Sequence, residues 1–234
     1  MHLEISDAVS VAPWGTFITT DELGDGFARL GVEVEIDGAK DRTLKVETRL
    51  LDANGQEVAA CVKEQKMLSS FVRDELTVEN PQLWTPESPA LYSAVTSIYE
   101  NGTLKDTYTT RVGIRIIEWK NGVGVLLNGK PVKFRGVCLH HDLGPLGAAV
   151  NKAAVKRQFA IMQDMGANAI RTAHNMPAPE QIELCDEMGL MVMAESFDEW
   201  GKAKCKNGYN RFFDEWAERD LQNLIRRFRN HPSI

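Results

Sequence analysis

The spacing of the apolar residues changes once along this 234-residue chain, and that change restricts the folds available to it. Up to about residue 115, apolar and polar residues alternate with a period of two, as in Val32-Glu33-Val34-Glu35-Ile36, which is typical of strands with one buried face. After about residue 137, short apolar strands alternate with segments of helical spacing. We therefore predict two domains, a β domain over residues 1–115 and an α/β domain over residues 116–234.

Asparagine–glycine pairs mark the turns of the first region. Asp52-Ala53-Asn54-Gly55 and Glu100-Asn101-Gly102-Thr103 tolerate the positive φ that tight hairpin turns need. Short strands joined by such turns predict an antiparallel β-sandwich. Residues 101–103 also match a glycosylation sequon, but we favour the turn because the sequence shows no secretory signal.

The second region consists of strand–helix pairs. Asn-Gly turns at 119–122 and 127–130 lead into the predicted elements, which are a strand at 132–137, a helix through Val155, Phe159 and Met162 that ends at Gly166, a strand at 169–172, a helix from Pro179 to Gly189, a strand at 190–194 and a helix at 212–228. Proline in the first turn and glycine after the last are expected helix boundaries. The repeated pairs imply a parallel sheet with right-handed crossovers, either a barrel or a doubly wound sheet.

The last predicted helix carries an apolar stripe. The stripe is formed by Phe213, Trp216, Ala217, Leu221, Leu224 and Phe228. Residues spaced in this way on one helix face are typical of core packing, and we interpret the stripe as core.

Composition excludes several classes of function. The net charge of −6 and a pI of about 5.5 argue against a nucleic-acid partner, because phosphate binding needs a net basic face. No apolar run is long enough to span a membrane. The cysteines lack ligand spacing and are predicted to be reduced thiols, at Cys61, Cys138, Cys185 and Cys205. Nucleotide-binding glycine motifs and the nucleophile elbow are absent from the sequence.

Strand-like alternation begins almost directly after Met1. We therefore expect the sequence to be an internal segment of a longer protein, with any targeting signal outside it. The compartment stays open between a bacterial cytoplasm and a periplasm.

Polar side chains follow each predicted parallel strand. The three groups are Leu139-His140-His141-Asp142, Arg171-Thr172-Ala173-His174-Asn175 and Glu195-Ser196-Phe197-Asp198-Glu199-Trp200. Because ligands bind at the carboxyl ends of parallel strands, these groups predict one site. Imidazole, carboxylate, amide and indole groups suit a sugar, whose hydroxyls need donors and acceptors and whose C–H face packs on an aromatic ring.

A metal site is the alternative at the same rim. His140, His174 and one carboxylate would supply three ligands. This interpretation is weaker, because metal-dependent barrel hydrolases usually place two histidines two residues apart on the first strand. His140 and His141 are adjacent, so in an extended chain they point to opposite sides.

The ordered motifs of the chain resemble glycoside hydrolase family 2, and among its activities the β-galactosidases. The resembling segments are Asn80-Pro81-Gln82-Leu83-Trp84-Thr85-Pro86, Arg111-Val112-Gly113-Ile114-Arg115, Leu127-Asn128-Gly129-Lys130-Pro131, Phe134-Arg135-Gly136-Val137 leading to His140, Asn168-Ala169-Ile170-Arg171, His174, Leu184-Cys185-Asp186 and Arg229-Asn230-His231-Pro232-Ser233. The resemblance covers essentially the whole chain. It implies an immunoglobulin-like β-sandwich at 1–115 followed by the first part of a (β/α)8 TIM barrel at 116–234.

The resemblance also implies an activity and a set of site residues. It implies a retaining exo-β-glycosidase acting on a β-linked, galactose-like sugar. His140 and His174 match histidines that line the sugar subsite, and Arg171 is expected to orient the carboxylates. The remaining predicted sugar-binding residues are Asn175, Glu195, Asp198 and Trp200.

The resemblance places both catalytic glutamates of the family on later strands. No catalytic residue is therefore expected in this chain, and the chain alone is expected to be inactive. Some β-galactosidases bind magnesium through an acidic residue and a histidine after the third strand. Glu199 is a candidate for the first, but Gly201 stands where the histidine would be, so no cofactor is expected.

Two further expectations concern partners. A carbohydrate-binding or interaction module is the alternative function, and family relatives include β-glucuronidases and β-mannosidases, so the sugar stays open. Three parallel strands that do not close a barrel would leave two sheet edges and an apolar inner face exposed. We therefore expect self-association through the open barrel edge.

Overall fold

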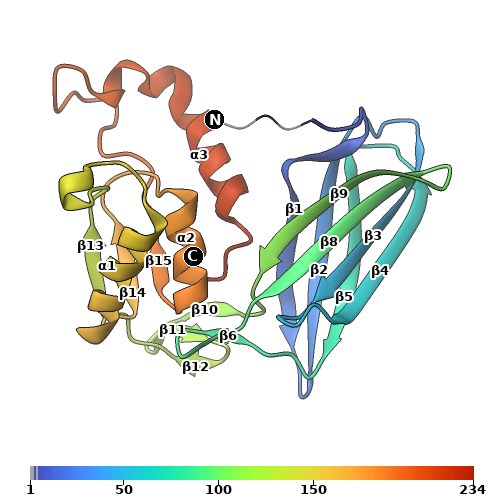
Figure 1. Cartoon of the computed structure of the whole chain (residues 1–234), viewed down its shortest axis with the longest axis horizontal. Coiled ribbons are helices and arrows are strands. Elements are labelled where there is room, and N and C mark those ends of the chain that lie inside the picture. The colour runs from blue at the N-terminus through green and yellow to red at the C-terminus, as the bar shows by residue number, and fades with distance from the viewer. Residues whose placement is uncertain (1–2, 4) are drawn as a thin grey trace. The chain divides into compact units, whose positions relative to one another are not determined.

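The computed structural model describes residue 3 and residues 5–234. Met1, on which the expectation of an internal start depends, lies outside the described residues. The chain forms two compact units, one of Met1–Trp84 with Ala90–Pro131 and the other of Thr85–Pro89 with Val132–Ile234 (Figure 1). None of the described helices is both long and apolar enough to cross a membrane.

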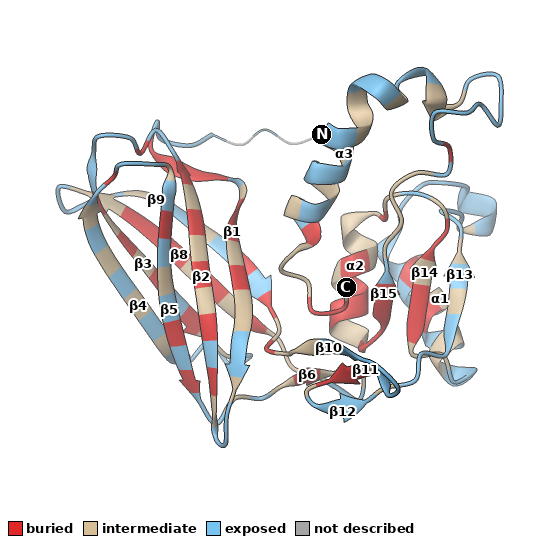
Figure 2. Cartoon of the chain, turned by 180° about the vertical axis from the view of Figure 1, so that it is seen from behind, coloured by how far each residue is buried: buried red, intermediate tan, exposed pale blue. Residues whose placement is uncertain are grey.

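Two antiparallel sheets face each other in the first unit. One sheet has the order β1(Ser10–Leu23), β2(Phe27–Asp37), β5(Phe71–Glu79), and the other β4(Glu57–Lys66), β3(Thr43–Leu51), β8(Tyr92–Glu100), β9(Thr103–Val112). Leu30 pairs with Leu76 and Val34 with Val72, and all four are buried, whereas Glu33 between them is only partly buried. The alternation of buried positions with less buried ones along β2 and β5 is visible in Figure 2. The predicted period-two pattern and sandwich are confirmed.

The predicted hairpin turns are present as well. Asn101 and Gly102 have φ of 50° and 77° at the turn between β8 and β9. At the turn between β3 and β4, Asp52 Oδ1 accepts hydrogen bonds from the backbone of Asn54 at 2.8 Å and of Gln56 at 2.9 Å. The carboxylate thus satisfies backbone donors that the turn leaves without a strand partner.

Two groups of short strands accompany the sandwich. They are β6(Trp84–Thr85) with β7(Ser88–Pro89), and β10(Ile117–Lys120), β11(Gly124–Leu127) and β12(Lys130–Pro131). Of these the first unit includes β10, β11 and β12, whereas Thr85–Pro89 belongs to the second unit. Asn128 ties the second group to the sandwich, since its Oδ1 accepts from the Ile116 N–H at 2.9 Å and its Nδ2 donates to the Trp84 carbonyl at 3.1 Å. These bonds explain why the first compact unit extends to Pro131; the division at residues 115 and 116 stays a prediction.

The first parallel strand is shifted from its predicted position. We predicted Val132–Val137, but β13 is Gly136–Leu139, and residues 132–135, all of which are described, belong to no strand. The side chain of Asn168 pairs with this segment instead: Oδ1 accepts from the Arg135 N–H at 2.7 Å and Nδ2 donates to the Lys133 carbonyl at 3.0 Å. The backbone N–H of Asn168 also donates to the Arg135 carbonyl at 2.9 Å, so this one residue replaces the ladder bonds that a strand would make.

The second unit is a three-stranded parallel sheet with helices. Its elements are β13, η1(Gly144–Leu146), α1(Lys152–Asp164), β14(Ala169–Thr172), α2(Pro179–Met188), β15(Met191–Met193), η2(Tyr209–Arg211) and α3(Phe213–Phe228), and the strand order is β13-β14-β15. Asn151 caps α1 by accepting from the Ala154 N–H at 3.0 Å. Gly189, at φ 73°, ends α2 in the left-handed conformation. The predicted strand–helix order is confirmed.

The helices of this unit pack on one face of the sheet. Phe159 of α1 and Ile182 of α2 share a buried cluster with Ile170 of β14. On the opposite face Cys138 and Met193 are exposed. Helices on a single face are typical of a barrel wall, whereas a doubly wound sheet is covered on both faces.

The prediction that the apolar stripe of helix α3 is core is wrong for most of the helix. Among the stripe residues only Phe228 is buried, and Leu221 is exposed. The amino-terminal end of the helix packs elsewhere, because Phe213 contacts Phe197 and Trp200 with ring centroids 5.8 Å apart in each pair. The helix thus joins the core through its last turns and an aromatic cluster through its first.

The carboxyl-terminal motif is anchored on a buried carboxylate. Asp186 of α2 accepts from the Ser233 N–H at 3.1 Å and the Ser233 hydroxyl at 2.6 Å, and it contacts His231 Nδ1 at 2.5 Å. The Ser233 carbonyl accepts from the Val192 N–H at 2.7 Å, so the β15 edge is partly covered. The expectation of two open sheet edges is wrong at this edge.

All four cysteines are free thiols, as predicted.

Candidate functional site

The carboxyl ends of the parallel strands bring four predicted site residues together. The His140 and His174 rings, which follow β13 and β14, meet edge to face with centroids 5.5 Å apart. Glu195, two residues after β15, contacts His174 Nδ1 through Oε2 at 2.9 Å and pairs through Oε1 with Nε of Arg171. We call His140, Arg171, His174 and Glu195 the histidine cluster.

Side chains of the strands hold the histidine cluster in place. The Glu195 N–H donates to the hydroxyl of buried Thr172 at 3.0 Å. Arg171 Nη1 donates to the sulfur of Cys138, its register partner on β13, at 3.4 Å. This hydrogen bond and the negative charge of Glu195 raise the pKa of Arg171, so the guanidinium stays positive.

The contacts of His174 determine which ring nitrogen can meet a ligand. Nδ1 faces Glu195 at 2.9 Å and Arg171 at 3.3 Å. The shorter contact, with Glu195, calls for a proton on Nδ1, because a carboxylate only accepts. The longer contact, with Arg171, calls for the other tautomer, because a guanidinium only donates. In the tautomer that the Glu195 contact calls for, Nε2 is an acceptor, suited to a sugar hydroxyl. The peptide bond between Ala173 and His174 is cis.

Two other predicted residues line a separate pocket. Asn175 and Asp198 lie on the wall of a pocket of about 380 Å³ that also includes Ser196, Phe197 and Tyr209. We call it the loop pocket. Lys204 donates to Asp198 at 3.0 Å, and this bond lowers the pKa of Asp198, as do the charge of Lys204 and the charges that His174 and His140 carry in their protonated forms. The loop pocket is therefore within electrostatic reach of the histidine cluster.

Glu199 organises the loop that forms one wall of this pocket. The side chain is only 4% exposed. Its carboxylate accepts backbone N–H groups of Lys204, of Cys205 at 3.1 Å and of Asn210 at 2.9 Å. These bonds, that from Asn210 first, lower the pKa of Glu199. A Cβ on Gly208 would lie 1.6 Å from Glu199 Oε2, so the loop can close around the carboxylate only with glycine there.

The surroundings of Glu199 do not fit a magnesium ligand. Three N–H donors already occupy three of the roughly four acceptor sites of the carboxylate, and their positive ends would repel a cation. Within the described part of the chain, no three His, Cys, Asp or Glu residues are grouped to hold a metal ion.

Trp200 is the seventh predicted residue. Its indole is 62% exposed and stacks on Phe213 with an interplanar angle of 29°. Phe213 supports one side of the indole, which leaves area for an apolar sugar face.

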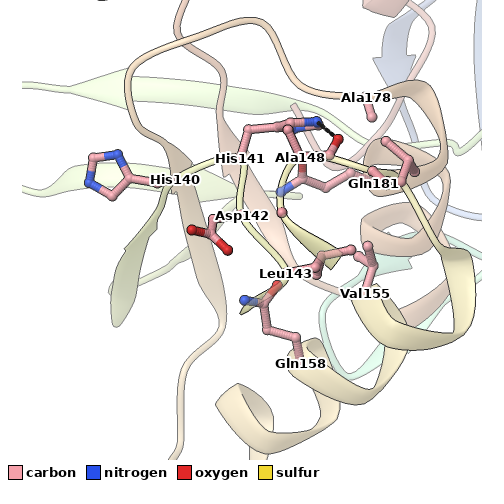
Figure 3. Close-up of a pocket in the computed structure, with 12 residues that line it drawn as sticks. His140, His141, Asp142, Leu143, Ala148, Val155, Gln158, Ala178 and Gln181 are labelled. Carbon is pink, nitrogen blue, oxygen red and sulfur yellow. Dashed lines mark hydrogen bonds between the residues drawn. The ribbon is translucent and has the colours of Figure 1, made fainter. Parts of the chain in front are cut away.

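Adjacent His140 and His141 point in opposite directions. His141 Nε2 contacts the Ala148 carbonyl at 3.1 Å, whereas the ring of His140, a residue that also lines the small pocket of His141, extends in the opposite direction (Figure 3). The small pocket of His141 also includes Leu143, Val155 and Gln181. His141 therefore supports its own loop, and His140 is the histidine available to the rim.

A sandwich followed by a one-sided parallel sheet, with imidazole, carboxylate and indole groups on its rim, is the arrangement of a glycoside hydrolase. The family model of the glycosyl hydrolases family 2 matches residues 10–115, and the model of the TIM barrel domain of that family matches residues 117–234. The chain belongs to glycosyl hydrolase family 2. The predicted immunoglobulin-like sandwich and first part of a TIM barrel are confirmed.

Three relatives show the extent of the similarity. A β-galactosidase of Bacteroides ovatus is 43% identical over 97% of this chain and 27% of its own length. A family 2 member from Bacteroides cellulosilyticus has a TM-score of 0.92 at 31% identity, over 97% of this chain and 30% of its own. A β-glucuronidase of Bacteroides uniformis has a TM-score of 0.79 at 29% identity, over 98% and 28%. The chain spans about a quarter to a third of the length of these relatives.

Sequence reasoning missed several residues that shape the rim. Cys138 and Thr172 hold Arg171 and Glu195, and Gly208 makes room for Glu199. The register of two parallel strands would have paired Cys138 with Arg171. Gly208 has no sequence signal, because its importance depends on a carboxylate nine residues away.

Proposed function

We propose that this chain forms part of the sugar-binding wall of a retaining exo-acting β-glycosidase, with a β-galactoside as substrate. The observation that carries the proposal is the histidine cluster at the carboxyl ends of β13, β14 and β15. It presents imidazole groups toward the rim where ligands bind in barrel enzymes. Trp200, on the same loop as Glu195, adds an apolar stacking surface.

We further propose that the chain alone does not hydrolyse glycosides. Retaining hydrolysis needs two carboxyl groups about 5–5.5 Å apart, one nucleophilic and one that exchanges a proton. Each rim carboxylate is engaged otherwise: Glu195 with Arg171 and His174, Asp198 with Lys204, and Glu199 with backbone N–H groups. These contacts support positioning roles for all three.

The charges at the rim favour a neutral galactoside over a glucuronide. A glucuronide carries a carboxylate, which is best bound by an unpaired arginine or lysine. Arg171 is paired with Glu195, and Lys204 with Asp198.

The proposal is tested with the chain itself. We expect saturable galactose binding in a titration and no turnover of nitrophenyl β-galactoside above a buffer blank. His174→Ala should weaken galactose binding roughly fivefold or more, since one hydrogen bond contributes about 1 kcal/mol. His141→Ala is the matched control, because that ring contacts Ala148 away from the rim. Turnover by the chain, or equal losses in the two variants, would contradict the proposal.

A further inference from the structure

We infer that the sandwich carries a glycan-binding site of its own, on the outer face of the sheet β1-β2-β5, and that its ligand is a neutral β-linked oligosaccharide (Figure 1). Every residue that lines this site belongs to the first unit, so the site shares no residue with the rim of the parallel sheet. The inference therefore goes beyond the proposed function. We call the site the sheet pocket, and its wall includes Phe17, Thr19, Asp21, Gly31, Arg73 and Glu75.

The sheet pocket forms where the central strand lacks a side chain. Leu30 and Val32 of β2 are buried in the core, so Gly31 between them faces outward. The register partners of Gly31 are Thr19 on β1 and Glu75 on β5, and the hollow lies between their side chains. Its volume is about 550 Å³, which is within the range of small-molecule sites.

A β-bulge adds a carboxylate to the wall. The register of β1 and β2 shifts between Thr20 and Glu22, so Asp21 is the extra residue of β1. Asp21 Oδ1 accepts from the Thr19 hydroxyl at 2.6 Å, and a Cβ on Gly31 would lie 2.6 Å from Asp21 Oδ2. Oδ2 therefore lies over the glycine, where it can accept a hydrogen bond from a ligand. Bulges redirect side chains in this way near functional sites.

Arg73 supplies donors on the opposite side of the sheet pocket. Its Nε pairs with Glu33 Oε2 at 2.6 Å, and its carbonyl accepts from Lys63 Nζ at 2.7 Å. These contacts hold Arg73 in place, yet its side chain is 80% exposed. Within the described residues, neither the Nη groups of Arg73 nor the Glu75 carboxylate has a hydrogen bond or an ion pair, so both are available to a ligand.

The charges of the sheet pocket favour a neutral ligand with many hydroxyls. A cation would meet the Arg73 guanidinium, and an anion would meet the carboxylates of Asp21, Glu33 and Glu75. A sugar hydroxyl both donates and accepts, so it suits carboxylates and guanidinium alike. The half-buried Phe17 ring offers an apolar surface for the C–H face of a pyranose. Because the chain belongs to a glycosyl hydrolase family, oligosaccharides are the neutral ligands that it meets.

The test follows the backbone amide NMR signals of the isotope-labelled chain during titration with a β-linked galactotetraose. We expect saturable shifts at residues 19, 31 and 75, because these residues flank the hollow. Signals of the sheet pocket and of the rim are resolved residue by residue, so the two sites are measured independently in one titration. His174→Ala should weaken binding at the rim and leave the affinity of the sheet pocket within about twofold.

Two pairs of variants test the wall. Arg73→Ala and Glu75→Ala should each weaken binding at the sheet pocket roughly tenfold, since each removes a charge-assisted hydrogen bond. Arg29→Ala is the matched control for Arg73→Ala, because Arg29 pairs with Glu22 at 2.9 Å on the same sheet and does not line the pocket. Glu47→Ala, on β3 of the other sheet, is the control for Glu75→Ala. Both controls should change the affinity by less than about twofold.

Gly31→Ala tests the floor of the sheet pocket. Its methyl group displaces the Asp21 carboxylate and should weaken binding there about 3- to 10-fold. Absence of shifts at residues 19, 31 and 75, or equal losses in the Arg73 and Arg29 variants, would overturn the inference and leave the proposed function untouched. Shifts at these residues with spermine but not with the tetraose would overturn it as well, because the carboxylates would then bind a cation.

Discussion

The two units of this chain bury their sheets differently. In the sandwich, both sheets turn alternate residues into one shared core, which includes Leu30, Ile36, Leu44 and Ile98. In the second unit, helices cover one face of the sheet, and on the other Met193 is 61% exposed. The sandwich therefore buries the inner faces of both its sheets by itself. The parallel sheet, in contrast, leaves one face and the carboxyl ends of its strands uncovered by its own helices.

The sharpest test of this comparison uses one methionine from each unit. Met67 is fully buried in the sandwich, and Met193 lies on the uncovered face. Met67→Ala should lower the free energy of unfolding by about 2–5 kcal/mol, because it leaves a cavity in a packed core. Met193→Ala should change it by less than about 0.5 kcal/mol. Urea unfolding followed by tryptophan fluorescence measures both, and similar losses would show that the two faces are equally packed.

Within the second unit, the largest effect is expected at Asp186. Asp186→Ala removes the acceptor of two Ser233 groups and of His231, so unfolding should become easier by about 2–3 kcal/mol. The control is Glu183→Ala on the same helix, which breaks an exposed ion pair with Lys152 at 3.1 Å and should cost at most about 1 kcal/mol. Urea unfolding followed by helical circular dichroism reports on this unit, since α1, α2 and α3 all belong to it. Equal costs would remove the proposed anchoring role.

The uncovered face should also determine association. Met193 and Cys138 are exposed there, and within the described residues β13 pairs with a strand on one side only. We expect the isolated chain to self-associate through this face, and Met193→Lys to shift sedimentation velocity toward the monomer. A wild-type chain that sediments as a monomer at all concentrations would contradict this expectation.

The smallest expected effect is a pH dependence of the rim loop. Hydrogen bonds from Asn210, Lys204 and Cys205 hold the pKa of Glu199 below its ordinary value of 4.5. A lowered pKa in the folded state means that the stabilisation is fully present above pH 4.5 and is lost as the pH falls through the folded-state pKa. The backbone amides of residues 204–210 should therefore lose protection from hydrogen exchange as the pH falls below 4.5 and through the folded-state pKa of Glu199. Glu199→Gln should have low protection at every pH; an identical pH step in that variant would exclude Glu199 as the cause.

Much of the fold was predictable because its signals are local. Alternation in β2 depends on neighbours two residues apart, and helix α2 is bounded by Pro179 and Gly189, whose backbone preferences are intrinsic. The bounds of β13 were not predictable, because Asn168, more than thirty residues away, supplies the hydrogen bonds of the preceding segment. The prediction that the stripe of α3 is core failed for a similar reason. The spacing of apolar residues identifies an apolar helix face, but it does not identify the segment that covers that face.

The sequence by itself determined the order of sandwich and strand–helix pairs, the turns, the family and the side chains that follow each parallel strand. Only the tertiary structure decided how those side chains are divided between the histidine cluster and the loop pocket. His174 and Glu195 meet in one cluster, whereas Asn175, the next residue after His174, lines another pocket. Glu199 turned out to hold a loop because Gly208 leaves room for its carboxylate. The periodicity of a strand or helix depends on residues close together in the sequence. The partner of a carboxylate depends on which distant segments the fold brings next to it.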